Sequence, residues 1–147
     1  MGYIKSVVTG TISILIISMF IVTMGLLPTY LMYHFQNKSI SDFLLSLLNF
    51  IFFYQDEGVF SWMLWYVGGV ISGLVARSIV KGILSAFSVP IILITLYWIL
   101  LVFPLISAPI DMWEILDKLY YLTDVALKFA LISAVGGILG GAATRQR

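Results

Sequence analysis

Long apolar runs separated by short polar stretches dominate the pattern of this chain. Four runs reach the ~20 residues that a helix needs to cross the hydrocarbon core of a bilayer. They cover residues 7–32, 60–80, 83–107 and 123–143. Pro90 lies in the third run, where neighbouring helices in a bundle can satisfy the carbonyl group that a proline leaves without a partner. The pattern therefore predicts an all-α integral membrane protein with four transmembrane helices.

Two shorter segments are too short to cross a bilayer but carry an apolar face. They cover residues 41–54, after the first run, and 111–121, after the third. We expect both to be interfacial helices on the outer side of the membrane. The chain then forms a single membrane domain, residues 1–147, made of two halves at 1–80 and 81–147. Each half has the order span, outer interfacial helix, span, so the two helix pairs share one direction and have a parallel topology.

A glycine-rich motif occurs near the end of each half. Val67-Gly68-Gly69-Val70-Ile71-Ser72-Gly73, followed by Arg77, returns as Val135-Gly136-Gly137-Ile138-Leu139-Gly140-Gly141, followed by Arg145. Small residues at this spacing let two helix backbones approach closely, which is a main source of helix association in lipid. The motif indicates packing between the second and fourth spans, an interface between copies or subunits, or a narrow pathway between the halves. The candidate helix-packing residues are Gly68, Gly69, Ser72, Gly73, Gly136, Gly137, Gly140 and Gly141.

Composition and charge support the membrane assignment and predict an orientation. The chain is 61% hydrophobic and 10% charged, with a mean hydropathy of +1.08, whereas soluble domains average about 25% charged residues. With four spans, one side receives basic residues without acids, and the other receives every acid. Basic residues in short loops stay in the cytoplasm, so we expect a cell-membrane protein with both termini cytoplasmic. The basic side holds Lys5, Arg77, Lys81, Arg145 and Arg147.

These basic residues have two interpretations. Arg77 and Arg145 follow the glycine motifs at equivalent positions, where long side chains can reach the cytoplasmic headgroups and fix the topology. Alternatively, Arg77 and Arg145 join Lys81 and Arg147 in a basic ring that binds anionic lipid headgroups or another anionic ligand. The net charge of +1 is scattered rather than gathered in a stripe, so we expect no nucleic-acid partner.

Asp124 and Lys128 are the ionisable residues that reach furthest into a predicted span. Their spacing of four residues suits an ion pair on one helix face. If the fourth helix begins at 125, the pair lies at headgroup level. If Tyr120 and Tyr121 mark the boundary, Lys128 lies inside the membrane and needs Asp124 as its partner. Trp62, Trp65 and Tyr66 are also expected near the outer boundary, where amphipathic rings gather.

The sequence holds no constellation typical of an enzyme or a metal protein. Cysteine is absent, and His34 is the one histidine, so we expect no catalytic residue, metal site or cofactor. An enzyme that acts on lipid stays open as a third hypothesis, and it would have to use acids on the outer side. Those acids are Asp111, Glu114, Asp117 and Asp124. Asn37-Lys38-Ser39 fits the pattern of a glycosylation acceptor on the outer face.

Small size and glycine-faced helices favour a protein that works through contacts inside the bilayer. The leading hypothesis is a non-catalytic structural or accessory subunit of a membrane assembly. Its partners would be membrane lipids and either other membrane-protein subunits or copies of itself. The alternative is a small transporter or channel, formed between the halves or in an oligomer. A transporter requires a wet cavity, and the polar residues available to line one are Ser72, Thr95, Ser133 and Lys128.

Overall fold

A computed structural model describes residues 2–23, 40–53, 58–102 and 112–145 of the chain. Within these ranges the protein is entirely helical and has no strand. Residues 24–32 of the first expected span, residues 103–107 of the third, Asn37 and Arg147 lie outside the described residues. The helices are α1 (Gly2–Thr23), α3 (Ile40–Phe53), α4 (Gly58–Ala76), α5 (Ile79–Val102) and α6 (Met112–Ala143).

Three of these helices are long and apolar enough to cross a membrane. The qualifying segments are Gly2–Ile21 of α1, Ile79–Leu100 of α5 and Leu119–Ala143 of α6. In α4 the corresponding apolar segment is shorter, Trp62–Ala76. The structure therefore confirms a helical protein suited to a membrane, with three helices that qualify by length and composition.

The segment expected as a separate helix over 111–121 is part of a longer one. From Met112 onward, α6 continues without a break to Ala143, a length of 32 residues. No glycine or proline occurs from Met112 to Val135, so nothing in the sequence ends the helix near residue 122. At 1.5 Å per residue α6 is about 48 Å long, longer than the ~30 Å hydrocarbon core of a bilayer.

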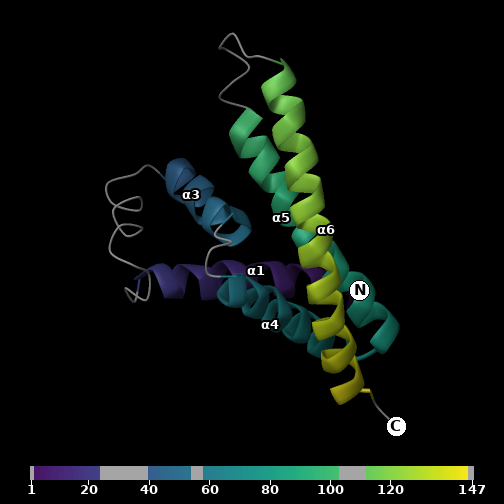
Figure 1. Ribbon diagram of the computed structural model, residues 1–147. Coiled ribbons are helices and arrows are strands. Elements are labelled where there is room, and N and C mark those ends of the chain that lie inside the picture. The colour runs from purple at the N-terminus through teal and green to yellow at the C-terminus, as the bar shows by residue number, and fades with distance from the viewer. Residues whose placement is uncertain (1, 24–39, 54–57, 103–111, 146–147) are drawn as a thin grey trace.

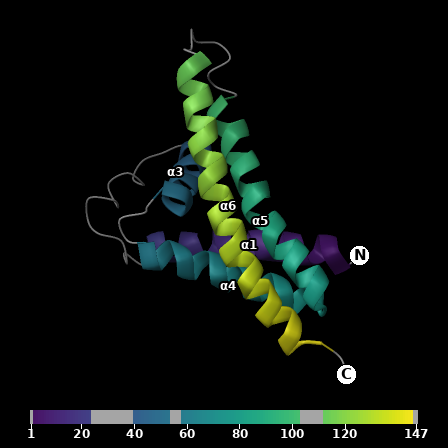
Figure 2. The ribbon, with the colours of Figure 1, turned by 45° about the vertical axis from the view of Figure 1, so that its right-hand side comes forward.

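The helices form two hairpins that cross obliquely. In Figures 1 and 2, α1 and α4 run side by side, α5 and α6 form a second pair, and α4 and α1 cross this second pair near its lower half. Each pair is antiparallel, because Ile14 of α1 meets Gly68 whereas the earlier Gly10 meets Ser72, and Gly137 of α6 meets Gly82 whereas the later Gly141 meets Ser78. The short helix α3 lies in the angle between the two hairpins and contacts α5 and α1.

An aromatic cluster fills the space on which α3, α4, α5 and α6 converge. Trp65 of α4 stacks on Phe129 of α6, with ring centroids 5.2 Å apart. Phe52 of α3 packs against both rings, at 5.3 Å from Trp65 and 6.3 Å from Phe129. Tyr97 of α5 completes the cluster at 6.4 Å from Phe52. Burial of these large rings holds α3 in the angle between the hairpins.

Large apolar side chains cover the outer surfaces of both hairpins. A water-soluble helix would place polar residues at such positions, whereas a helix in lipid keeps them apolar. On α1 the exposed residues recur at intervals of four, and on α6 at intervals of four as well. They are Ile4, Val8, Ile12 and Ile16 on α1, and Leu127, Leu131, Val135 and Leu139 on α6.

Arg77 ends α4 in a conformation that favours glycine. Its φ is 52°, in the left-handed region, and its backbone N–H donates to the carbonyl of Gly73 at 3.2 Å. A single bond of this kind from the residue after the helix is the hydrogen bond of the αL helix cap. A residue with a Cβ loses about 1–2 kcal/mol in this conformation relative to the right-handed helix.

Replacing Arg77 with glycine should therefore stabilise the protein. We expect Arg77→Gly to raise the free energy of unfolding in a neutral detergent by about 1 kcal/mol, because glycine removes the steric conflict. Arg77→Ala is the matched control, since it removes the same long side chain but keeps the Cβ. Chemical denaturation followed by circular dichroism measures both, and equal stabilities for the two variants would contradict the prediction.

Candidate functional site

The closest contacts of the fold lie along α4 and α6, which run in the same direction. A Cβ added to Gly69 would fall on the carbonyl group of Ser133, 2.8 Å from its carbon. One turn further, a Cβ on Gly73 would overlap the carbonyl oxygen of Gly137 and lie 2.8 Å from the backbone nitrogen of Gly141. Side chains at these glycines would therefore push the two backbones apart.

The second stripe of glycines on α6 also faces α4. A Cβ on Gly136 would lie 2.9 Å from the backbone nitrogen of Val70, and one on Gly140 would lie 2.8 Å from that of Leu74. Both would also overlap carbonyl oxygens of α4. The contact is thus backbone against backbone on both stripes, which gives dense van der Waals packing without large side chains.

Helix α5 joins this contact through Gly82, a residue that the sequence analysis did not select. A Cβ on Gly82 would lie 2.6 Å from the carbonyl oxygen of Gly137 and 3.2 Å from the Cα of Gly73. Gly73, Gly82 and Gly137 thus meet from three helices, and we call this set the glycine junction. A signal was present in the sequence, because Gly82 and Ala86 have the same four-residue spacing, and Ala86 also faces Gly137.

Helix α1 packs on the other face of α4. Gly68 accommodates the side chain of Ile14, and a Cβ on Gly10 would lie 3.0 Å from the Cβ of Ser72. Gly68 and Ser72 therefore contact α1, whereas Gly69 and Gly73 contact α6. The eight residues of the candidate packing set are all buried within this one chain.

A buried cluster of three hydroxyl groups lies beside the glycine junction. Ser6 of α1 donates to Ser85 of α5 at 2.8 Å, and Ser72 of α4 donates to the same oxygen at 3.0 Å. Ser85 in turn donates to the carbonyl of Gly82 at 3.2 Å. All three serines are fully buried. Hydrogen bonds between helices are favourable where water is absent, and this network connects α1, α4 and α5.

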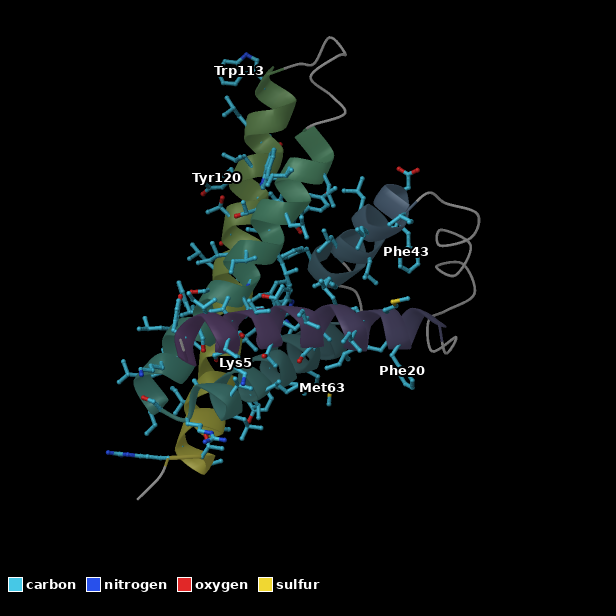
Figure 3. The ribbon with its side chains drawn as sticks, turned by 180° about the vertical axis from the view of Figure 1, so that it is seen from behind. Lys5, Phe20, Phe43, Met63, Trp113 and Tyr120 are labelled. Atoms are coloured by element: carbon cyan, nitrogen blue, oxygen red, sulfur yellow. The ribbon has the colours of Figure 1, made fainter. Side chains whose placement is uncertain are left out.

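Asp124 and Lys128 form an ion pair on the outer surface of α6. The Lys128 Nζ and an Asp124 carboxylate oxygen lie 2.7 Å apart, and the two side chains are 54% and 67% exposed for Asp124 and Lys128 respectively. The pair therefore faces away from α4 and α5 and takes no part in the glycine junction. Trp113 and Tyr120 project from the same helix, also away from α5 (Figure 3).

The basic residues Arg77, Lys81 and Arg145 are all exposed. Arg77 lies in the α4–α5 turn, Lys81 lies in the first turn of α5, and Arg145 follows α6. Figures 1 and 2 show the α4–α5 turn and the end of α6 at the same end of the molecule. Lys5 lies on α1, and its side chain points from the surface of the α1–α4 pair opposite α3 (Figure 3).

In the part of the chain that the structure describes, two buried polar side-chain atoms have no hydrogen-bond partner, the Nε1 of Trp65 and the Oγ of Ser133. Trp65, expected near the outer membrane boundary, is fully buried against Phe129 and does not present its ring to lipid headgroups. Trp62, three residues earlier on α4, is 59% exposed.

No group of three or more His, Asp or Glu side chains that could hold a metal ion occurs within the described ranges. No protein-family model matches the chain, and no similar protein was found among curated proteins or solved structures. Its functional interpretation therefore depends on the helix contacts and the outer surface.

An alanine at the glycine junction should destabilise the fold. We expect Gly137→Ala to lower the free energy of unfolding by about 2 kcal/mol, because its Cβ would lie 2.7 Å from that of Ala86 and overlap the carbonyl of Gly82. Gly2→Ala is the matched control, since nothing lies within 4 Å of the added Cβ. Denaturation in a neutral detergent compares the two, and equal stabilities would show that the close contact does not form.

Proposed function

We propose that this chain is a small multi-pass membrane protein that acts as a non-catalytic structural or accessory subunit of a membrane assembly. Packing through glycine-faced helices makes the subunit itself rigid, and its outer apolar surfaces face lipid or a partner subunit. The partners proposed are other membrane proteins or further copies of this chain, together with the surrounding lipids.

One observation favours this proposal over a transport function. The polar residues available to line a path between the helices point in different directions. Ser72 is bonded inside the hydroxyl cluster, and Ser133 is buried against Gly69. Thr95 is exposed and donates to the carbonyl of Ile91 in its own helix, and Lys128 is paired on the outer surface. These side chains therefore do not converge on one path, and glycine contacts occupy the space between α4, α5 and α6.

The proposal includes four spans in the cell membrane and both termini in the cytoplasm. In it, α4 crosses the membrane in addition to α1, α5 and α6. The antiparallel contacts of α1 with α4 and of α5 with α6 support it, because each of these two pairs would then cross the membrane an even number of times. The 19 residues of α4 give a length of about 28 Å, close to the hydrocarbon thickness. The positions of the basic residues support the same orientation.

Purification in a mild detergent tests the assembly function. We expect the tagged chain to elute as a complex of fixed stoichiometry, larger than its own mass of 16.4 kDa. Substitutions with tryptophan at the exposed Ile12 and Ile16 of α1, and at Leu131 and Val135 of α6, compare the two outer surfaces. We expect one pair to disrupt the complex while helix content is unchanged, because large changes at a packed interface separate its partners.

Reconstitution in vesicles distinguishes the transport alternative. We expect the purified chain to produce no ion or solute flux above that of empty vesicles. A sustained flux, together with a monomeric chain in detergent, would contradict the structural role and favour a transporter.

Cysteine labelling tests the proposed topology, since the native chain has no cysteine. We expect Ile40→Cys, at the exposed start of α3, to react with a membrane-impermeant maleimide on intact cells. Thr144→Cys, directly after α6, should react only after the membrane is permeabilised. Labelling of both positions on intact cells, or of neither, would refute four spans with cytoplasmic termini.

A further inference from the structure

The α4–α5 turn and the end of α6 bring three basic residues to one end of the molecule. A Cβ on Gly141 would lie 2.7 Å from the carbonyl oxygen of Ser78 and 2.9 Å from the Cα of Ile79. The two backbones therefore touch at this point. Arg77 directly precedes Ser78 and Lys81 lies two residues after Ile79. Arg145 lies four residues after Gly141 and two after the end of α6.

Within the described helices, no acid lies near these basic residues to balance their charge. The sequence contains no Asp or Glu in α1, α4 or α5, and none after Asp124 in α6. Asp124 precedes Gly141 by 17 residues, which places it about 25 Å away along the axis of α6. It is also already paired with Lys128. We call Arg77, Lys81 and Arg145 the basic corner.

We propose that the basic corner binds the headgroups of anionic phospholipids, on the membrane face at which α4 and α6 end. Here the apolar surfaces of α5 and α6 give way to exposed cations, so these cations meet the phosphate layer when the helices are in a bilayer. Arginine presents a planar fork of donors that matches phosphate oxygens, and lysine adds a further positive charge. The inference depends on the membrane placement proposed above and adds a lipid class to it.

Lipid selectivity of the full-length protein tests this proposal. The protein is reconstituted in phosphatidylcholine vesicles, and spin-labelled phosphatidylglycerol and phosphatidylcholine are compared by electron paramagnetic resonance. We expect the protein to favour phosphatidylglycerol, and the preference to weaken with added salt. Arg77→Gln, Lys81→Gln and Arg145→Gln, made singly, should each reduce the preference by up to about fivefold.

Lys128→Gln is the matched control, because it removes one positive charge from α6, the helix that Arg145 follows, but outside the basic corner. We expect it to leave the preference unchanged. An equal effect of Lys128→Gln and Arg145→Gln, or no preference in the native protein, would overturn the proposal. Circular dichroism of each variant verifies that the helices are intact, and the exposed positions of the three residues make loss of folding in all three variants unexpected.

Inorganic phosphate separates a lipid headgroup from a soluble phosphate compound. At equal ionic strength, phosphate should weaken the lipid preference more than chloride does, because the arginine forks match phosphate oxygens, but the preference should persist if the corner binds headgroups at the membrane surface. Complete loss of the preference in phosphate, with the preference retained in chloride, would point to a soluble ligand and overturn the lipid assignment. Failure here leaves the cysteine-labelling result unaffected, so the lipid proposal and the topology can fail separately.

Discussion

The fold depends on close approach of helix backbones at the glycine junction. In lipid, burying an apolar side chain against a neighbouring helix gains little, because the lipid tails are equally apolar. Association therefore relies on dense packing and on polar contacts between backbones. Gly73, Gly82 and Gly137 allow three helices to touch in this way. Beside them, Ser6, Ser72 and Ser85 add hydrogen bonds that link α1 to the same region. Packing and polar contacts thus reinforce each other at one end of the bundle.

Close contact at the glycine junction determines the size of the side chains needed elsewhere between the hairpins. Because the hairpins cross obliquely (Figures 1 and 2), they diverge with distance from their closest approach. Large side chains fill the space that opens, and the stacked pair of Trp65 and Phe129 lies two turns before Gly73 and Gly137. Phe52 supplies the remaining volume from α3. The short helix α3 therefore packs in the angle between the two hairpins, and its apolar face contributes to the core rather than facing lipid alone.

The sequence predicted the helical class, the helix at 41–54 and the importance of residues such as Gly73 and Gly137. Repetition made these glycines visible, because the same motif occurs twice. Gly82 and Ser85 do not belong to a repeated motif. Their role depends on which helices contact one another, and the periodicity of the sequence does not contain that information. Trp65 shows the same limit, since an aromatic residue near a predicted boundary suits either the headgroups or a core. The continuity of α6 through residue 122 was predictable, because no helix-breaking residue occurs there.

The two copies of the glycine motif do not make equivalent contacts, and this asymmetry limits which surfaces remain for the proposed partners. Gly68 faces α1, the hairpin partner of α4, whereas the corresponding Gly136 faces α4, the helix of the other hairpin. Gly137 contacts its own hairpin partner α5, whereas Gly69 faces α6. Each of the two helices carries two adjacent stripes of small residues and so has two close neighbours. The stripe that contacts the hairpin partner in α4 corresponds to the stripe that contacts the other hairpin in α6. Since these stripes are occupied within the chain, the proposed partner subunit would contact the large apolar residues outside them, such as Ile12 and Leu131. Such a surface would pack by side-chain shape, so a change of partner would leave the glycine contacts within the chain undisturbed.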